Sequence, residues 1–260
     1  MKFDFLSYKK ALLILGLMLC IIPKGLVAQN EKPKNLLMYD EKPYHFGFIV
    51  AINSMTFNMN YIDSYQFVEH DGSEYPHYPE NPNTDLDTYY ARSVEPTIQG
   101  GFSVGVVGNL RLAKYFDLRL IPTLSFNNRR INYQFYSEEV QNSDKNFDHS
   151  RQIFSTIMEF PLLVKYRSKR LNNIAAYMIA GANPKIDLSK RRENSFHLTR
   201  FDVAAEVGAG FDFYTGYFKM GVEIKMGFGL LNVLKKQDNL YDSSIESMKN
   251  RVVQMSLTFE

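Results

Sequence analysis

The sequence has a single cysteine, Cys20, and no tryptophan among its 260 residues. One cysteine cannot build a disulfide framework or a cysteine-based zinc site, and its place near the start leaves the folded part without a cysteine nucleophile. An excess of one charge is also missing, because 30 Lys and Arg residues face 28 Asp and Glu residues and give a formal net charge of +2. Nucleic-acid-binding proteins usually carry a clear basic excess, so the balance argues against that class.

Long apolar runs are absent after the start of the chain, where none approaches the roughly 20 residues of a helical membrane span. The mean hydropathy of −0.27 is too polar for a bundle of transmembrane helices. The chain is rich in aromatic residues, with 20 Phe and 17 Tyr, and this composition favours strands over helices. With 45% hydrophobic and 22% charged residues, the chain can bury a core, as one large domain or two small ones.

The first 28 residues have the pattern of a secretory signal peptide. Lys9 and Lys10 precede an apolar run over residues 11–22, and the small residue Ala28 follows where a cut is expected. Cys20 would suggest a lipoprotein, but the residues directly before it are not the small ones that a lipidated cysteine requires. We therefore expect a signal peptide at 1–28, cleavage after Ala28, and a periplasmic N-terminal segment at 29–43.

The rest of the chain alternates with a period of two. From residue 98 to 112 the even positions are almost all apolar and the odd positions mostly polar or glycine, and segments 201–213, 218–230 and 253–259 repeat the pattern. Successive side chains of a strand point to opposite faces, so each segment has one apolar face and one polar, glycine-rich face.

Eight such strands can be placed, and their connections alternate between short and long. This is the signature of an eight-stranded antiparallel transmembrane β-barrel of the outer membrane, in which short turns face the periplasm. An even strand count puts both ends of the barrel, residues 44–260, on that side. The expected strands are 44–57, 97–112, 116–133, 152–167, 174–187, 198–213, 218–231 and 251–259. The expected long extracellular loops are 58–96, 134–151, 188–197 and 232–250.

Pro122 and Pro161 fall inside expected strands. Proline cannot donate a hydrogen bond to the ladder, so we expect a bulge or a position at the rim for each.

A soluble eight-stranded barrel such as a lipocalin would turn its apolar face inward. Here the polar face carries six acids and six bases, and buried charges must be paired. Lipid outside and a lumen filled with paired charges explain both faces. The charged set is Arg111, Asp117, Arg119, Glu159, Lys165, Arg167, Asp202, Glu206, Asp212, Lys219, Glu223 and Lys225. An aromatic girdle is expected at the short turns from Tyr44, Tyr115, Phe116, Tyr166, Tyr214, Tyr217 and Phe218.

No catalytic, cofactor-binding or metal-ligating set stands out. The five histidines form no His-x-x-x-His pair, and no Gly-x-Ser-x-Gly elbow contains one. The acidic residues and histidines of 69–87 could bind a divalent cation, although a solvated loop is the commoner explanation. Lumen carboxylates such as Glu206 and Glu223 lack a nucleophile and an oxyanion donor, so we interpret them as ion-pair partners. The basic run 165–170 is either a solvated turn or a contact for acidic partners or lipid headgroups.

Several motifs resemble the PorT (SprT) proteins of Bacteroidetes. The likeness covers nearly all of the chain after residue 28 and is weakest in 58–96, which resembles an insertion. The most specific stretch is EFPLLVKYRSKRLNN at 159–173 with YMIAGANP at 177–184. Further matches are NLRL at 109–112, FDLR at 116–119, PTLSF at 122–126, 129–133, EVGAGFDFY at 206–214, YFK at 217–219 with Glu223, and GLLNVL at 229–234.

This resemblance implies a non-enzymatic outer-membrane barrel required by the type IX secretion system, which exports folded proteases and gliding adhesins. The expected partners are outer-membrane lipid and other secretion components at the periplasmic rim, with no nucleic acid, small-molecule substrate or cofactor. A generic small barrel with an adhesive or membrane-stabilising role is the alternative, and a barrel enzyme acting on lipid is a third possibility.

Overall fold

The computed structural model of the chain describes residues 34–62, 69–71, 88–136, 146–189, 198–234 and 245–260. The signal peptide expected at 1–28 lies outside these residues. The described part is built from strands and one short 3-10 helix, η1 (Tyr39–Glu41). The strands are β1 (Tyr44–Tyr61), β2 (Glu69–Asp71), β3 (Thr88–Thr97), β4 (Gln99–Arg111), β5 (Phe116–Leu120), β6 (Thr123–Tyr136), β7 (Asn146–Glu159), β8 (Leu162–Arg167), β9 (Ile174–Asp187), β10 (Phe201–Tyr214), β11 (Lys219–Gly229) and β12 (Ile245–Phe259).

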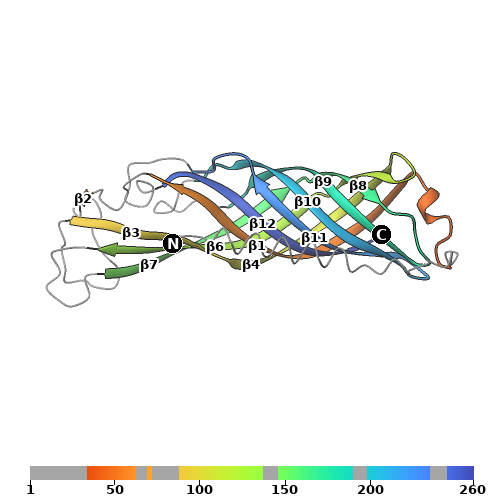
Figure 1. The fold of residues 1–260 in the computed structure, drawn as a ribbon, viewed down its shortest axis with the longest axis horizontal. Helices are drawn as coiled ribbons and strands as arrows, with labels where there is room; N and C mark the ends of the chain where they lie inside the picture. Colours follow the sequence, from red (N-terminus) through yellow and green to blue (C-terminus); the bar gives the residue numbers. More distant parts are fainter. Residues whose placement is uncertain (1–33, 63–68, 72–87, 137–145, 190–197, 235–244) are drawn as a thin grey trace, which may run out of the picture.

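The strands close into a ring with antiparallel neighbours (Figure 1). The order β10-β11-β12-β1-β4-β5-β8-β9 is completed by pairing of β9 with β10. Interruptions split three of the long strands, so that β3 and β4, β5 and β6, and β7 and β8 are halves of single chain passages. The eight-stranded antiparallel barrel expected from the sequence is therefore confirmed.

Two of the interruptions fall at the prolines. Pro122 separates β5 from β6 and Pro161 separates β7 from β8, as the missing N–H of proline predicts. Neither proline lies at the rim, because the carbonyl group of each still accepts a hydrogen bond from a neighbouring strand of the wall. The amide of Val106 donates to the Pro122 carbonyl at 3.0 Å, and the amide of Ile121 donates to the Pro161 carbonyl at 3.0 Å.

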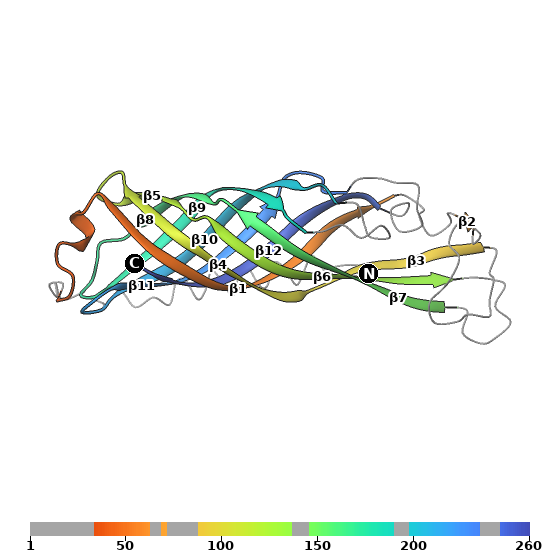
Figure 2. The same ribbon diagram turned by 180° about the vertical axis from the view of Figure 1, so that it is seen from behind.

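The wall reaches further on one side than the sequence pattern suggested. Beyond Pro122, β6 pairs with β3 and β7, and β2 adds to the edge of β3, so these strands form an arm past the ring (Figures 1 and 2). The expected loops 58–96, 134–151 and 232–250 are thus partly strand, since β1 continues to Tyr61, β3 begins at Thr88, β7 at Asn146 and β12 at Ile245. Pro, Asn and Asp residues in these stretches had indicated loops.

Inward and outward side chains alternate as expected. On β4, the apolar Phe102, Val104 and Val106 are exposed, and Ser103 between them is buried. An exposed apolar wall around a polar interior is the arrangement of a barrel whose outer surface meets lipid. Among the helices of the described residues, none has the length and apolar character needed to cross a membrane.

The two rims differ. We call the end that carries residues 112–115, 168–173, 215–218 and the N-terminal segment 34–43 the short-turn rim, and the opposite end, with the arm, the long-loop rim. Tyr44, Phe116, Tyr166, Tyr217 and Phe218 are exposed around the short-turn rim, where the girdle was expected.

Tyr214 does not belong to this girdle. Its side chain is buried and points into the mouth of the barrel, where its hydroxyl donates to Asp40 at 2.8 Å. Asp212 and Glu206 at other even positions of β10 are also buried, so the alternation itself assigns Tyr214 to the inner face.

Candidate functional site: the filled lumen and its capped mouth

Three buried ion pairs fill the lumen near the short-turn rim. The side chains of all six residues are at most 3% exposed. The hydroxyl of Tyr177 also donates to Glu223 at 3.0 Å, and the Lys165 ammonium lies 3.7 Å from the centre of the Tyr177 ring. Each charge therefore faces an opposite charge, as burial requires. The pairs, with their N–O distances, are Arg119–Glu223 at 2.8 Å, Lys165–Asp212 at 2.7 Å and Lys219–Glu260 at 2.7 Å.

A second polar layer crosses the middle of the barrel. The side-chain amide of Asn183 donates at 2.6 Å to both Glu159 and Glu206 and so bridges the two carboxylates. Lys225 pairs with Glu206 at 2.8 Å, and Lys185 pairs with Glu159 at 3.4 Å. This layer joins β7, β9, β10 and β11, so side chains from half of the chain passages around the barrel converge on it.

Towards the long-loop rim, Arg129 is the central cation. Its guanidinium donates to Asn250 at 3.0 Å and to Ser155, and it lies 3.6 Å from the Asp187 carboxylate. Asn250 in turn donates to Asp202 at 2.7 Å. Beyond this point the interior becomes apolar, with a core of Phe57, Val94, Ile131, Tyr133, Val233, Leu234, Ile245 and Met248.

The other end of the lumen is covered by residues 34–43, which we call the cap. Asn35 is tied to Asn173 and to the Tyr214 carbonyl, at the ends of β9 and β10. The Pro43 carbonyl accepts from the Arg111 amide on β4 at 2.8 Å. These anchor points lie on opposite sides of the ring, so the cap crosses the whole mouth.

Side chains of the cap enter the mouth. The ring of Tyr39 stacks on His45 with 4.0 Å between centroids and meets Tyr214 edge-on. Asp40 accepts from the Tyr214 hydroxyl and pairs with Arg167. Burial raises the pKa of the Tyr39 phenol well above its ordinary value, so it stays protonated. The cap is thus held by stacking and charge as well as by its backbone.

The lumen charges expected from the sequence are found there, apart from Arg111, which is half-buried. Sequence reasoning missed several cap and lumen residues, among them the charged Lys185, Arg129, Asp40 and Glu260. Lys185 and Arg129 lie in strands and share the inward parity of their neighbours, so the alternation could have found them. Asp40 and Glu260 lie outside the strands and carry no such signal.

The basic run 165–170 is not a free cationic surface. Lys165 and Arg167 point into the lumen, and the Arg170 guanidinium donates to the carbonyls of Leu36 and Asn35 and lies 3.7 Å from the Tyr214 ring. Only Lys169 of these four is exposed. The run therefore serves mainly to hold the lumen and the cap, because alternate residues of a strand end face inward.

Of the five histidines, His45 has a described side chain, and it is engaged by Tyr39. Most of the acidic loop considered for a cation lies outside the described residues. Within the part of the chain that is described, no three His, Cys, Asp or Glu side chains are grouped to hold a metal ion.

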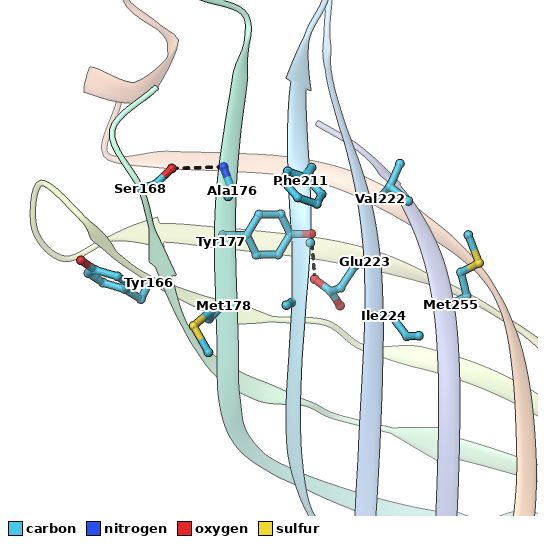
Figure 3. Close-up of a pocket in the computed structure, with 12 residues that line it drawn as sticks. Tyr166, Ser168, Ala176, Tyr177, Met178, Phe211, Val222, Glu223, Ile224 and Met255 are labelled. Atoms are coloured by element: carbon cyan, nitrogen blue, oxygen red, sulfur yellow. Dashed lines mark hydrogen bonds between the residues drawn. The ribbon is translucent and has the colours of Figure 1, made fainter. Parts of the chain in front are cut away.

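A hollow of about 580 Å³ lies on the outer wall over β9, β10 and β11 (Figure 3), and another of about 560 Å³ lies over β1, β4 and β12. The small residues Ala176 and Ala209 and the larger Met178 and Phe211 line the first hollow. Next to Ala209, Gly210 leaves room for the inward Tyr177, whose hydroxyl meets Glu223. Most of the residues that line this hollow are exposed and belong to the outer face of the barrel.

Valine at two neighbouring positions of this hollow should affect the stability of the barrel very differently. A Cβ atom at Gly210 would lie 2.5 Å from the Val222 carbonyl oxygen and 2.7 Å from the Tyr177 ring, so we expect Gly210→Val to destabilise the barrel by about 1–3 kcal/mol. Ala209→Val points into the hollow and should be tolerated. A folded barrel migrates faster than the unfolded chain in unboiled gel samples, so the urea concentration at which half of this band is lost measures the stability of each variant. Equal urea midpoints for the two variants would contradict the inward assignment of Gly210.

The chain has similarity to a known protein family and to a solved structure. The chain is similar to the outer membrane protein OprG from Pseudomonas aeruginosa, with 11% identity and a TM-score of 0.41 over 84% of this chain and 96% of that one. None of the curated proteins compared with the chain matches it. A family model for the outer membrane protein beta-barrel domain matches residues 28–235. Because this family model matches most of the chain, the chain belongs to the outer membrane protein beta-barrel domain family and is a protein of the bacterial outer membrane.

Proposed function

We propose that this barrel is a non-enzymatic accessory component of type IX protein secretion and acts through contacts with other proteins. The observation that carries the proposal is the position of the motifs that resemble PorT. In the stretch 159–184, Glu159, Lys165, Tyr177 and Asn183 build the lumen network, and Arg170 anchors the cap. The resemblance therefore concentrates in the residues that fill the lumen and close its mouth.

A filled lumen supports a role other than conduction. Eight strands enclose an interior just wide enough for side chains, and here ion pairs, an apolar core and the cap occupy it. Folded cargo has no route through such a barrel. Short turns of outer-membrane barrels face the periplasm, so the short-turn rim is the end that secretion components of the periplasm would reach.

Deletion of the gene tests the proposal directly. Export of proteases and surface adhesins should be abolished, with cargo retained in the periplasm, and a plasmid copy should restore it. The amounts of cargo in medium and periplasm are the readout, and leakage of a periplasmic marker controls for membrane damage. Export at the wild-type level in the deletion strain would refute the secretion role.

A generic small barrel is the second candidate, and the arm of β2, β3, β6 and β7 favours it because such an arm suits adhesion at the outer surface (Figure 2). The two candidates differ in what the arm does. Replacing residues 72–87 with a short linker should leave cargo export intact if the barrel serves secretion from the periplasmic side. The generic role would be favoured if the linker strain and the deletion strain both lose adhesion and both export cargo normally.

A further inference from the structure

Large apolar side chains are exposed at the end of the molecule, away from the barrel wall. Leu37 and Met38 of the cap are 67% and 69% exposed, and Tyr217 in the turn after β10 is 95% exposed. The cap with η1 lies past the ends of the strands, at the end opposite the arm (Figures 1 and 2). Leu37 and Met38 precede the first strand, and Tyr217, an aromatic residue of the girdle, lies in a turn and not in a strand of the wall.

Hydrogen bonds tie the cap to the two turns that carry the other exposed apolar residues of this rim. Asn35 binds both Asn173, in the turn before β9, and the carbonyl of Tyr214, which begins the next turn. Leu171, in the first of these turns, is 53% exposed. We call the surface made by Leu37, Met38, Leu171 and Tyr217 the rim patch. Exposed apolar patches of this kind mark interaction sites on proteins.

The rim patch is held in a fixed shape. Leu36 has φ of 47° and Asn172 has φ of 52°, and a leucine in this left-handed region is strained. The Arg170 guanidinium holds both residues through their carbonyl oxygens. Strained backbone that the surroundings enforce is characteristic of functional surfaces, and a surface ordered in advance binds with less loss of freedom.

The charges around the patch indicate the chemistry of its occupant. Lys34, Lys42 and Lys169 are exposed, whereas Asp40 is turned inward to Arg167, which leaves Glu41 as the exposed acid of the cap. A basic border around apolar side chains complements a protein surface that is apolar at its centre and acidic at its edge.

We infer that the rim patch is the docking surface for a periplasmic protein with an acidic, partly apolar face. This inference rests on the proposed function for the idea that the barrel works through protein contacts, and it adds the surface and the partner's chemistry. Anionic lipid headgroups would share the charge preference but not the need for the apolar centre.

Photo-crosslinking in intact cells tests the inference on the full-length protein. A benzophenone side chain at Met38 and, separately, at Tyr217 should capture the same acidic protein, identified by mass spectrometry. The matched control is Lys114, which is exposed on another turn of the same rim and should capture it at least about tenfold less. Equal capture from Lys114, different proteins at the two test positions, or crosslinks to lipid alone would overturn the inference.

Binding of the identified protein to the purified barrel gives the second readout. Leu37→Ser with Met38→Ser should weaken binding about tenfold, as truncation of central contacts does, and Lys34→Glu with Lys169→Glu should remove its salt dependence. Lys114→Glu is the control and should bind as the wild type does. Vesicles of anionic and of neutral phospholipid test the headgroup alternative, and binding that follows vesicle charge but ignores the serine changes would overturn the protein partner.

The outcomes separate the two proposals. Loss of partner binding in the serine variant, together with normal cargo export in the deletion strain, would support the docking surface and refute the secretion role. Export that depends on the gene but not on the rim patch, with unchanged partner binding, would leave the secretion role and remove the docking surface. Heat-modifiable migration of each variant confirms that the barrel has assembled.

Discussion

Replacing Arg119 with methionine should destabilise the barrel by about 3–5 kcal/mol, because it leaves Glu223 buried without its cation. Arg119 and Glu223 are both fully buried and meet at 2.8 Å. The remaining partner of that carboxylate would be the Tyr177 hydroxyl, which cannot neutralise a charge. Urea titration of the folded fraction in detergent micelles, followed by the heat-modifiable band, measures the change.

The matched control is the double variant Arg119→Met with Glu223→Gln. Removing both charges of a buried pair is often neutral or stabilising, and glutamine keeps an acceptor for Tyr177. Glu260 keeps its own partner, since Lys219 lies 2.7 Å away. We therefore expect the double variant to recover most of the lost stability. A double variant as unstable as Arg119→Met would show that the pair does not act as a unit.

The sequence contained enough to predict which face each lumen residue occupies, but not which residue it meets. Arg119 and Glu223 alternate correctly within their own segments, so their inward direction follows from a period of two. They lie on β5 and β11, which are far apart around the ring. Their meeting depends on the register of every intervening strand and on the diameter of the closed barrel, and neither quantity is written in a local pattern.

The cap was beyond a periodic analysis for a different reason. Residues 34–43 form no strand, and their contacts are made by single side chains to the finished mouth, such as Asn35 to Asn173. Such contacts exist only once β9 and β10 have brought their ends together. The inward direction of Tyr214, by contrast, could have been predicted, because even-numbered residues of β10 point inward. We had assigned it to the girdle because it lies among other aromatic residues at the rim.

Arginine at Val106 should hinder folding far more than arginine at Leu112. Both side chains are apolar and similarly exposed, with 58% and 57% of their surfaces accessible. Val106 lies within β4, next to the interruption at Pro122, whereas Leu112 begins the turn at the short-turn rim. A lipid-facing arginine costs about 2–4 kcal/mol at the middle of the bilayer and about 0–1 kcal/mol near the interface. The expected difference therefore comes from depth alone.

The measurement is refolding into phospholipid vesicles, with the folded fraction read from heat-modifiable migration across a urea series. Each variant should also be refolded in detergent micelles, because a micelle adapts to a charged side chain more easily than a bilayer does and should narrow the gap. If Val106→Arg and Leu112→Arg unfold at the same urea concentration in vesicles, our placement of Val106 near the middle of the bilayer is wrong. If the difference in stability between the two variants is as large in micelles as in vesicles, depth in the bilayer does not explain it. The destabilisation would then come from packing within the wall.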